Sequence, residues 1–173
     1  MLFRSRQGLV GFRQTAGHVT DIKAVIAWLR NETKLPVWLI GTSRGTQSAA
    51  YIATQLTPEA GGPDGIVLTS SLTLDKREWP VQSLALDRIN VPALVVHHKQ
   101  DSCRASMASD VPRLTSKLKH LKRTDTLLFD GGKDEGDACE AFAYHGYNGI
   151  EAEVVGRIAQ WILASDRKST RLN

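Results

Sequence analysis

Hydrophobic residues along the chain recur in two alternating patterns. Short continuous apolar runs predict strands, and apolar residues spaced three and four apart predict amphipathic helices. The runs at 37–41, 66–69, 93–98 and 126–129 predict four strands, and the helical spacing predicts helices over 20–31, from the middle forties to 55, over 110–121 and over 150–163. Strands separated by helices are typical of an α/β fold. We therefore expect a mostly parallel sheet flanked by helices on both faces.

Composition and charge exclude several classes of protein. At 173 residues with 42% hydrophobic content, the chain is long enough to bury the core of one globular domain. No apolar run is long enough to cross a bilayer, and the first residues lack the apolar core of a signal peptide. The net charge of +4 comes entirely from the two ends, so the body is neutral and offers no basic surface to phosphates. We expect neither a nucleic acid nor a membrane as a partner.

The two ends of the chain lack the periodicity of its body. We interpret residues 1–16 as an N-terminal remnant that is partly foreign, above all Met1–Ser5, and residues 165–173 as a disordered or foreign tail. The alternative is that both are native disordered tails. The body, residues 17–164, forms the predicted domain.

The segment that follows the first predicted strand carries the best indication of chemistry. Gly41-Thr42-Ser43-Arg44-Gly45 lies between an apolar run and a helical stretch, where a nucleophilic serine is mounted on a sharp strand-to-helix turn. Such a turn brings two backbones close together, so small residues are expected at Gly41 and Gly45. The alternative is a purely structural turn.

A catalytic serine needs a base, and the base needs a carboxylate to orient it. Asp101 follows the strand at 93–98, and His145 lies in the loop before the last helix, so the chain order Ser, Asp, His is satisfied. Asp75, which follows the preceding strand, is the rival acid. His97 and His98 are weaker candidates for the base, because they lie in or at the end of a strand and precede the acid.

Metal binding by the two adjacent histidines is not favoured by the pattern. Neighbouring residues of a strand point to opposite faces, and no second cluster of ligands accompanies His97 and His98. We interpret both as structural, and we expect neither a metal nor a cofactor.

Four segments together resemble an α/β-hydrolase. They cover most of residues 17–164 and are the turn after Pro36, the strand and acid at 91–103, the strand end Phe129-Asp130-Gly131-Gly132, and the segment from His145-Gly146-Tyr147 to Glu151. The resemblance implies that Ser43 is the nucleophile, Asp101 the acid and His145 the base. It also implies that the backbone N–H of Arg44 is one donor of the oxyanion hole, and it assigns no role to the Arg44 side chain.

The resemblance covers only the C-terminal two-thirds of the family's fold. In that fold several strands precede the nucleophile, and one of their loops supplies the second oxyanion donor, so we expect an N-terminally truncated chain with an exposed strand edge. An exposed edge favours self-association by edge pairing. Loss of one oxyanion donor costs on the order of a hundredfold to a thousandfold in turnover, so an inactive fragment remains an alternative.

Two cysteines flank the proposed acid and base in the sequence. A hydrogen bond between Asp101 and His145 would bring the loops of Cys103 and Cys139 together, which makes a disulfide geometrically feasible. The alternative is two free thiols in a cytosolic protein. Related hydrolases with cysteines at such positions resemble exported bacterial proteins, which implies a periplasmic or secreted location.

The predicted function is hydrolysis of carboxylic esters or related small acyl compounds through an acyl-enzyme. The segment between the second and third strands is too short to hold a separate lid domain, so we expect an open site. A peptidase or an acyltransferase on the same scaffold remains an alternative, because all three share the triad.

Overall fold

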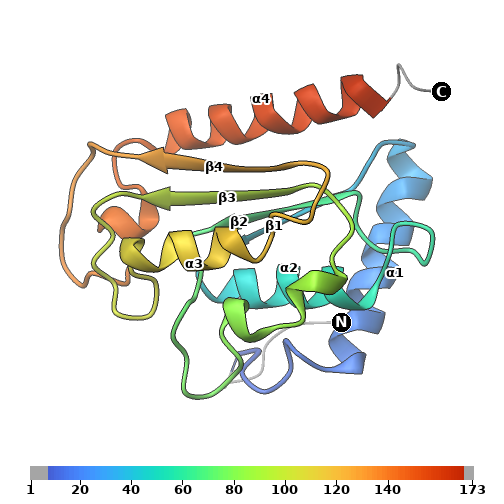
Figure 1. The fold of residues 1–173 in the computed structure, drawn as a ribbon, viewed down its shortest axis with the longest axis horizontal. Coiled ribbons are helices and arrows are strands. Elements are labelled where there is room, and N and C mark those ends of the chain that lie inside the picture. The colour runs from blue at the N-terminus through green and yellow to red at the C-terminus, as the bar shows by residue number, and fades with distance from the viewer. Residues whose placement is uncertain (1–7, 170–173) are drawn as a thin grey trace.

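A computed structural model describes residues 8–169, with side chains placed as far as residue 164. Its sheet has four parallel strands in the order β1-β2-β3-β4 (Figure 1), which confirms the predicted fold class. The strands are β1 (Trp38–Thr42), β2 (Gly65–Thr69), β3 (Ala93–His98) and β4 (Thr124–Phe129), and the helices are α1 (Ala16–Thr33), α2 (Arg44–Gln55), α3 (Val111–Ser116) and α4 (Glu151–Ser169). No helix in residues 8–169 is long and apolar enough to cross a bilayer.

Helices cover both faces of the sheet because successive strand residues point to opposite sides. Ile66, Leu68 and Val95 pack with α2 and α3 on one face. Val67 and Leu94 pack with α4 on the other face. All residues of β2 and β3 are buried, as expected for the central strands of a parallel sheet covered on both sides (Figure 1).

The helix ends differ from the sequence prediction in three places. α1 begins at Ala16 because the Thr15 hydroxyl, not that of Thr20, accepts the N–H of His18 and caps the helix. α3 ends at Ser116, and the chain to residue 121 continues in tighter turns with bonds between residues three apart. α4 reaches Ser169, beyond the predicted end at residue 163.

From residue 8, the N-terminal segment before α1 consists of turns. It is attached to the loop after β2, because Glu78 accepts hydrogen bonds from the Gly11 N–H and the Arg13 guanidinium. The prediction of foreign sequence at Met1–Ser5 lies outside the described residues, as do residues 170–173 of the predicted C-terminal tail. Residues 165–169, which we interpreted as part of a disordered or foreign tail, continue α4.

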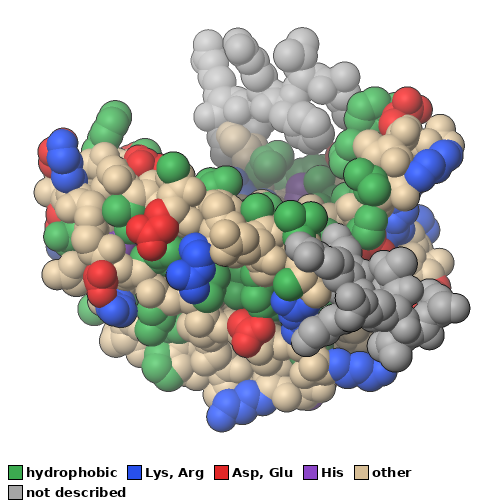
Figure 2. Space-filling view, turned by 90° about the horizontal axis from the view of Figure 1, so that it is seen from above, with side chains coloured by type: hydrophobic (Ala, Val, Ile, Leu, Met, Phe, Trp, Pro, Cys, Tyr) green, Lys and Arg blue, Asp and Glu red, His purple; other side chains and the backbone are tan. Residues whose placement is uncertain are grey.

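β1 forms one edge of the sheet and has no neighbour on its outer side within residues 8–169. Ile40 at its centre is 55% exposed. Ile40 also borders two hollows, one of about 280 Å³ on the α4 side and one of about 240 Å³ on the α2 side. In the view down onto α4, hydrophobic side chains line a hollow beyond that helix (Figure 2). Among residues 8–169, no strand therefore pairs with the outer side of β1, and hollows lie beside both of its faces.

Candidate active site

Ser43 occupies a strained turn between β1 and α2. Its φ of 51° and ψ of −117° lie outside the regions that residues with a side chain favour. Strain of this kind costs on the order of 1–3 kcal/mol and is concentrated at functional sites. A Cβ on Gly41 would overlap the carbonyl oxygen of Gly45, so the turn needs glycine at position 41. The sharp strand-to-helix turn predicted from the sequence is therefore present around Ser43.

The second glycine of the turn does not meet the same constraint. A Cβ on Gly45 would meet no atom within 4 Å. Gly45 borders the hollow on the α2 side, whose wall also includes His18 and Ile22 of α1. The expectation that close approach demands a small residue holds for Gly41 and is wrong for Gly45 in this structure.

Asp101 and His145 form the pair that the sequence predicted. The Nδ1 atom of His145 lies 2.9 Å from Oδ2 of Asp101, although 44 residues separate them in the chain. An ionised carboxylate only accepts, so Nδ1 carries the proton and donates it. The Nε2 atom of His145 is then an acceptor, and it is buried with no hydrogen-bond partner among the described residues. This is the tautomer that a general base requires.

Asp101 is held in its ionised form by the donors around it. Burial alone would raise the pKa of its carboxyl group, but hydrogen bonds from His145, His97 and the Cys103 N–H lower the pKa to about 2. The Ser106 hydroxyl also donates to Oδ2, at 3.2 Å. A buried carboxylate with this many donors keeps its charge and its orientation at neutral pH.

The carboxyl end of β2 connects the nucleophile turn to the base. The Ser43 N–H donates to the Thr69 carbonyl at 3.0 Å. The next residue, Ser70, donates its hydroxyl to the His145 carbonyl at 2.7 Å. Ser43 and His145 are thus each bonded to one of two consecutive residues at the same edge of the sheet.

Ser70 is a site residue that the sequence reasoning missed. It is fully buried and has a positive φ of 44°, as Ser43 does. Its position directly after a predicted strand was the only available signal, because a strained backbone cannot be read from sequence.

The rival acid, Asp75, is hydrogen-bonded to Arg44 and Gln47. Its Oδ2 accepts from the Arg44 guanidinium at 3.0 Å and from the Gln47 amide at 3.2 Å. Burial alone would raise the pKa of Asp75, but its hydrogen bonds from the Arg77 N–H and Gln47, with the nearby charge of Arg44, lower it. Asp75 therefore anchors the start of α2 to the loop after β2, and this contact gives the Arg44 side chain a structural role.

The two adjacent histidines have separate environments, as their opposite faces require. The ring of His98 stacks on Tyr144 at 4.3 Å, and its Nε2 lies 2.9 Å from the Gly131 carbonyl oxygen. This is the structural role that we predicted. His97 instead places Nε2 3.3 Å from Oδ2 of Asp101. The alternation along a strand separates the two side chains, but it does not say which of them faces the acid.

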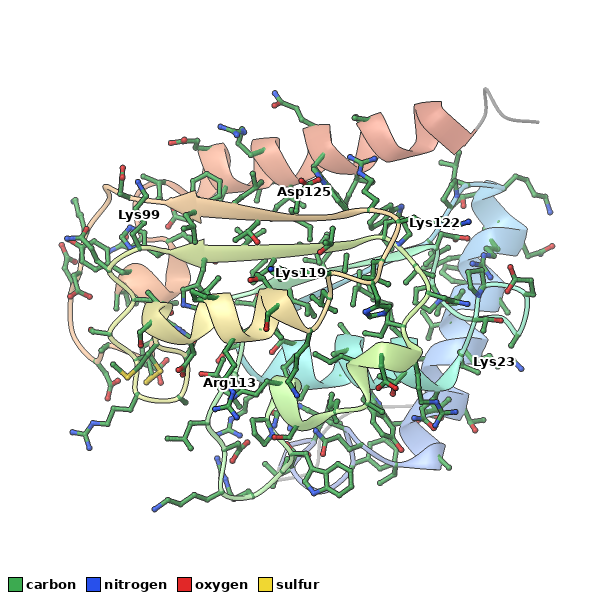
Figure 3. All side chains as sticks on the ribbon, viewed as in Figure 1. Lys23, Lys99, Arg113, Lys119, Lys122 and Asp125 are labelled. Atoms are coloured by element: carbon green, nitrogen blue, oxygen red, sulfur yellow. A yellow bond between two sulfur atoms is a disulfide. The ribbon has the colours of Figure 1, made fainter. Side chains whose placement is uncertain are left out.

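A disulfide joins Cys103 to Cys139, as the sequence reasoning expected. In Figure 3 it lies at the end of the molecule where the strands terminate. Cys103 is buried and its N–H donates to Oδ1 of Asp101, whereas Cys139 lies in the exposed loop before His145. The disulfide therefore connects the loop of the acid to the loop of the base.

The hollow on the α4 side lies beside the candidate site. Its wall includes Thr42, next to Ser43, and Gly146, next to His145. Most of the remaining wall is apolar and comes from α4, through Val154, Val155 and Ile158. Its volume of about 280 Å³ can hold a small group such as a short acyl chain.

The fold is similar to that of two solved proteins. One is a sugar hydrolase from Lactococcus lactis, with 15% identity and a TM-score of 0.60 over 87% of this chain and 69% of that protein. The other is a protein of unknown function from Agrobacterium tumefaciens, proposed to be an α/β hydrolase, with 19% identity and a TM-score of 0.59 over 97% of this chain and 68% of that protein. No protein-family model matches the chain, and no curated protein matches it significantly. Identities this low establish similarity of fold alone.

Proposed function

We propose that this chain, which has an α/β-hydrolase-like fold, is a serine hydrolase of carboxylic esters. The observation that carries the proposal is the hydrogen bond from His145 to Asp101, because it leaves the buried Nε2 of His145 free to accept a proton. The strained turn at Ser43, connected to the same strand end as His145, supports the assignment of the nucleophile.

In the proposed reaction Ser43 attacks the carbonyl carbon of the ester. Nε2 of His145 takes the proton from the hydroxyl as the new C–O bond forms, and Asp101 stabilises the resulting imidazolium. The ester C–O bond then breaks, and His145 returns the proton to the leaving alcohol. Water repeats the sequence on the acyl-enzyme and releases the carboxylic acid.

The oxyanion formed during the attack needs hydrogen-bond donors. Arg44 is the first residue of α2, so its N–H has no partner within the helix and is available as one donor. The apolar hollow beside Ser43 and His145 supports a small acyl group as the substrate portion bound there.

Labelling with a fluorophosphonate probe tests the proposal, because such probes react only with an activated serine. The unmodified chain should be labelled, and Ser43→Ala should abolish the labelling. Ser116→Ala is the matched control, since Ser116 is exposed on α3 and bonds only to the Arg113 carbonyl of its own helix. Equal labelling of Ser43→Ala, or no labelling of the unmodified chain, would overturn the proposal.

Substrate profiling then separates the enzymes that share this triad. Short-chain esters should be hydrolysed faster than peptide amides, and a competing alcohol should not divert the acyl group from water. Cleavage of peptides, or transfer to the alcohol, would favour the peptidase or the acyltransferase instead.

A further inference from the structure

The side chain of His97 is fully buried at the end of β3 and faces the proposed acid. Its Nε2 lies 3.0 Å from the Ser106 carbonyl oxygen and 3.3 Å from Oδ2 of Asp101. A carbonyl oxygen and a carboxylate both only accept, so Nε2 must carry the proton that points at them. The position of this proton follows from the chemistry of its two neighbours.

The other ring nitrogen of His97 determines its charge. Nδ1 is buried and has no hydrogen-bond partner among the described residues. Nδ1 therefore has no contact that fixes a proton on it, in contrast to Nε2. The contacts of the ring therefore place a proton on Nε2.

We propose that His97 is a positioning residue for the Asp101–His145 pair, holding Oδ2 of Asp101 in place through its Nε2–H. The inference rests on the hydrolase function proposed above. Oδ2 accepts hydrogen bonds from His145 and Ser106 and lies 3.3 Å from Nε2 of His97, while Oδ1 accepts from the Cys103 N–H. Rotation of the carboxylate would break several of these bonds at once, so the direction in which it presents Oδ2 to His145 is fixed.

Two other side chains near His97 have hydrogen-bond partners other than Asp101. His98 points to the opposite face and bonds to Gly131, and the hydroxyl of Tyr147 donates to the Val96 carbonyl. In the described part of the chain, Asp101 and His145 are the titratable groups in contact with the His97 and Ser106 cluster. His97 therefore acts on the reaction only through Asp101.

The first test is a measurement on the unmodified chain. Imidazole ¹⁵N chemical shifts at neutral pH report which nitrogen of each histidine carries a proton. His97 should show a protonated Nε2 and an unprotonated Nδ1, and His145 should show the opposite. An unprotonated Nε2 of His97 would overturn the proposal, and this result does not depend on activity.

The second test compares two substitutions of nearly equal shape. His97→Gln places an amide N–H near the position of Nε2, whereas His97→Met fills similar space without a donor. Fluorophosphonate labelling of Ser43 should slow about tenfold in His97→Met, while His97→Gln should stay within about threefold of the unmodified chain. Equal rates in the two variants would overturn the positioning role.

A control and a spectroscopic signature separate positioning from loss of folding. His98→Gln changes the adjacent buried histidine on the opposite face and should leave the His145 Nδ1–H resonance unchanged. His97→Met should shift that resonance, because Asp101 is its acceptor. If the unmodified chain is not labelled at all, the hydrolase function fails, and the ¹⁵N shifts and the Nδ1–H resonance still decide the role of His97.

Discussion

The acid and the nucleophile of the proposed triad lie in contrasting parts of the molecule. Asp101 follows a central strand, is buried, and accepts hydrogen bonds from several groups beside a disulfide. Ser43 follows an edge strand and depends on a strained turn with open hollows beside it. The proposed acid and base are held by several side-chain contacts at once. The nucleophile is held by backbone geometry at an open edge.

The contrast has a physical basis in how each residue is supported. A buried charge is stable only when it is surrounded by donors, so the sheet interior must supply a network around Asp101. The strained turn at Ser43 needs glycine at position 41 and the bond to Thr69, both of which the described strands provide. Substitutions of the acid, the disulfide and the edge strand test this difference.

Replacing the acid should have the largest effect. Asp101→Asn exchanges the carboxylate for an amide that can donate to Nδ1 of His145, which favours the wrong tautomer of the base. We expect the rate of fluorophosphonate labelling to fall about 10³- to 10⁴-fold, as in other triads. The matched control is Asp75→Asn, which removes the rival acid from its contact with Arg44. An equal loss in the two variants would contradict the assignment of Asp101.

Removing the disulfide should loosen the side of the molecule that holds acid and base. The bond spans 36 residues, so the double variant Cys103→Ala, Cys139→Ala should lose roughly 2–4 kcal/mol in free energy of unfolding. Chemical denaturation measures this loss. The unmodified chain in a reducing agent should behave in the same way. A reducing agent that leaves the stability of the unmodified chain unchanged would argue against a disulfide in solution.

A charged side chain on the exposed edge strand β1 should have the smallest effect on stability. We propose that the β1 edge mediates self-association, because β1 is uncharged and its outer side is unpaired within the described residues. Ile40→Lys should reduce association measured by sedimentation velocity, and it should change the free energy of unfolding by less than about 0.5 kcal/mol.

The opposite edge of the sheet supplies the control for this experiment. Leu128 on β4 is 50% exposed, but its strand carries Asp125, which lies on the α4 side of β4 (Figure 3) and accepts a hydrogen bond from Trp161. Leu128→Lys should therefore change association less than Ile40→Lys does. Equal association of both variants with the unmodified chain would exclude edge pairing through β1.

Much of the fold could be predicted from local patterns. The boundaries of β3 were predicted to the residue, because a buried central strand is a continuous apolar run bounded by Pro92 and a polar loop. Helix ends were less accurate: the helix predicted to start at residue 20 begins at Ala16, because the Thr15 hydroxyl accepts the N–H of His18 and caps it. The predicted domain boundaries at residues 16 and 164 stay predictions, as does the periplasmic or secreted location.

Residue type and order along the chain predict the candidate chemistry, through the glycine-flanked serine, the acid after a strand and the later histidine. The sequence made a bond between Cys103 and Cys139 feasible, and the structure contains it. The tertiary structure alone places His97 beside Asp101, bonds Ser70 to the His145 carbonyl and pairs Asp75 with Arg44. These contacts join residues from different strands and loops. Their partners are set by how the sheet brings strand ends together, which no local pattern encodes.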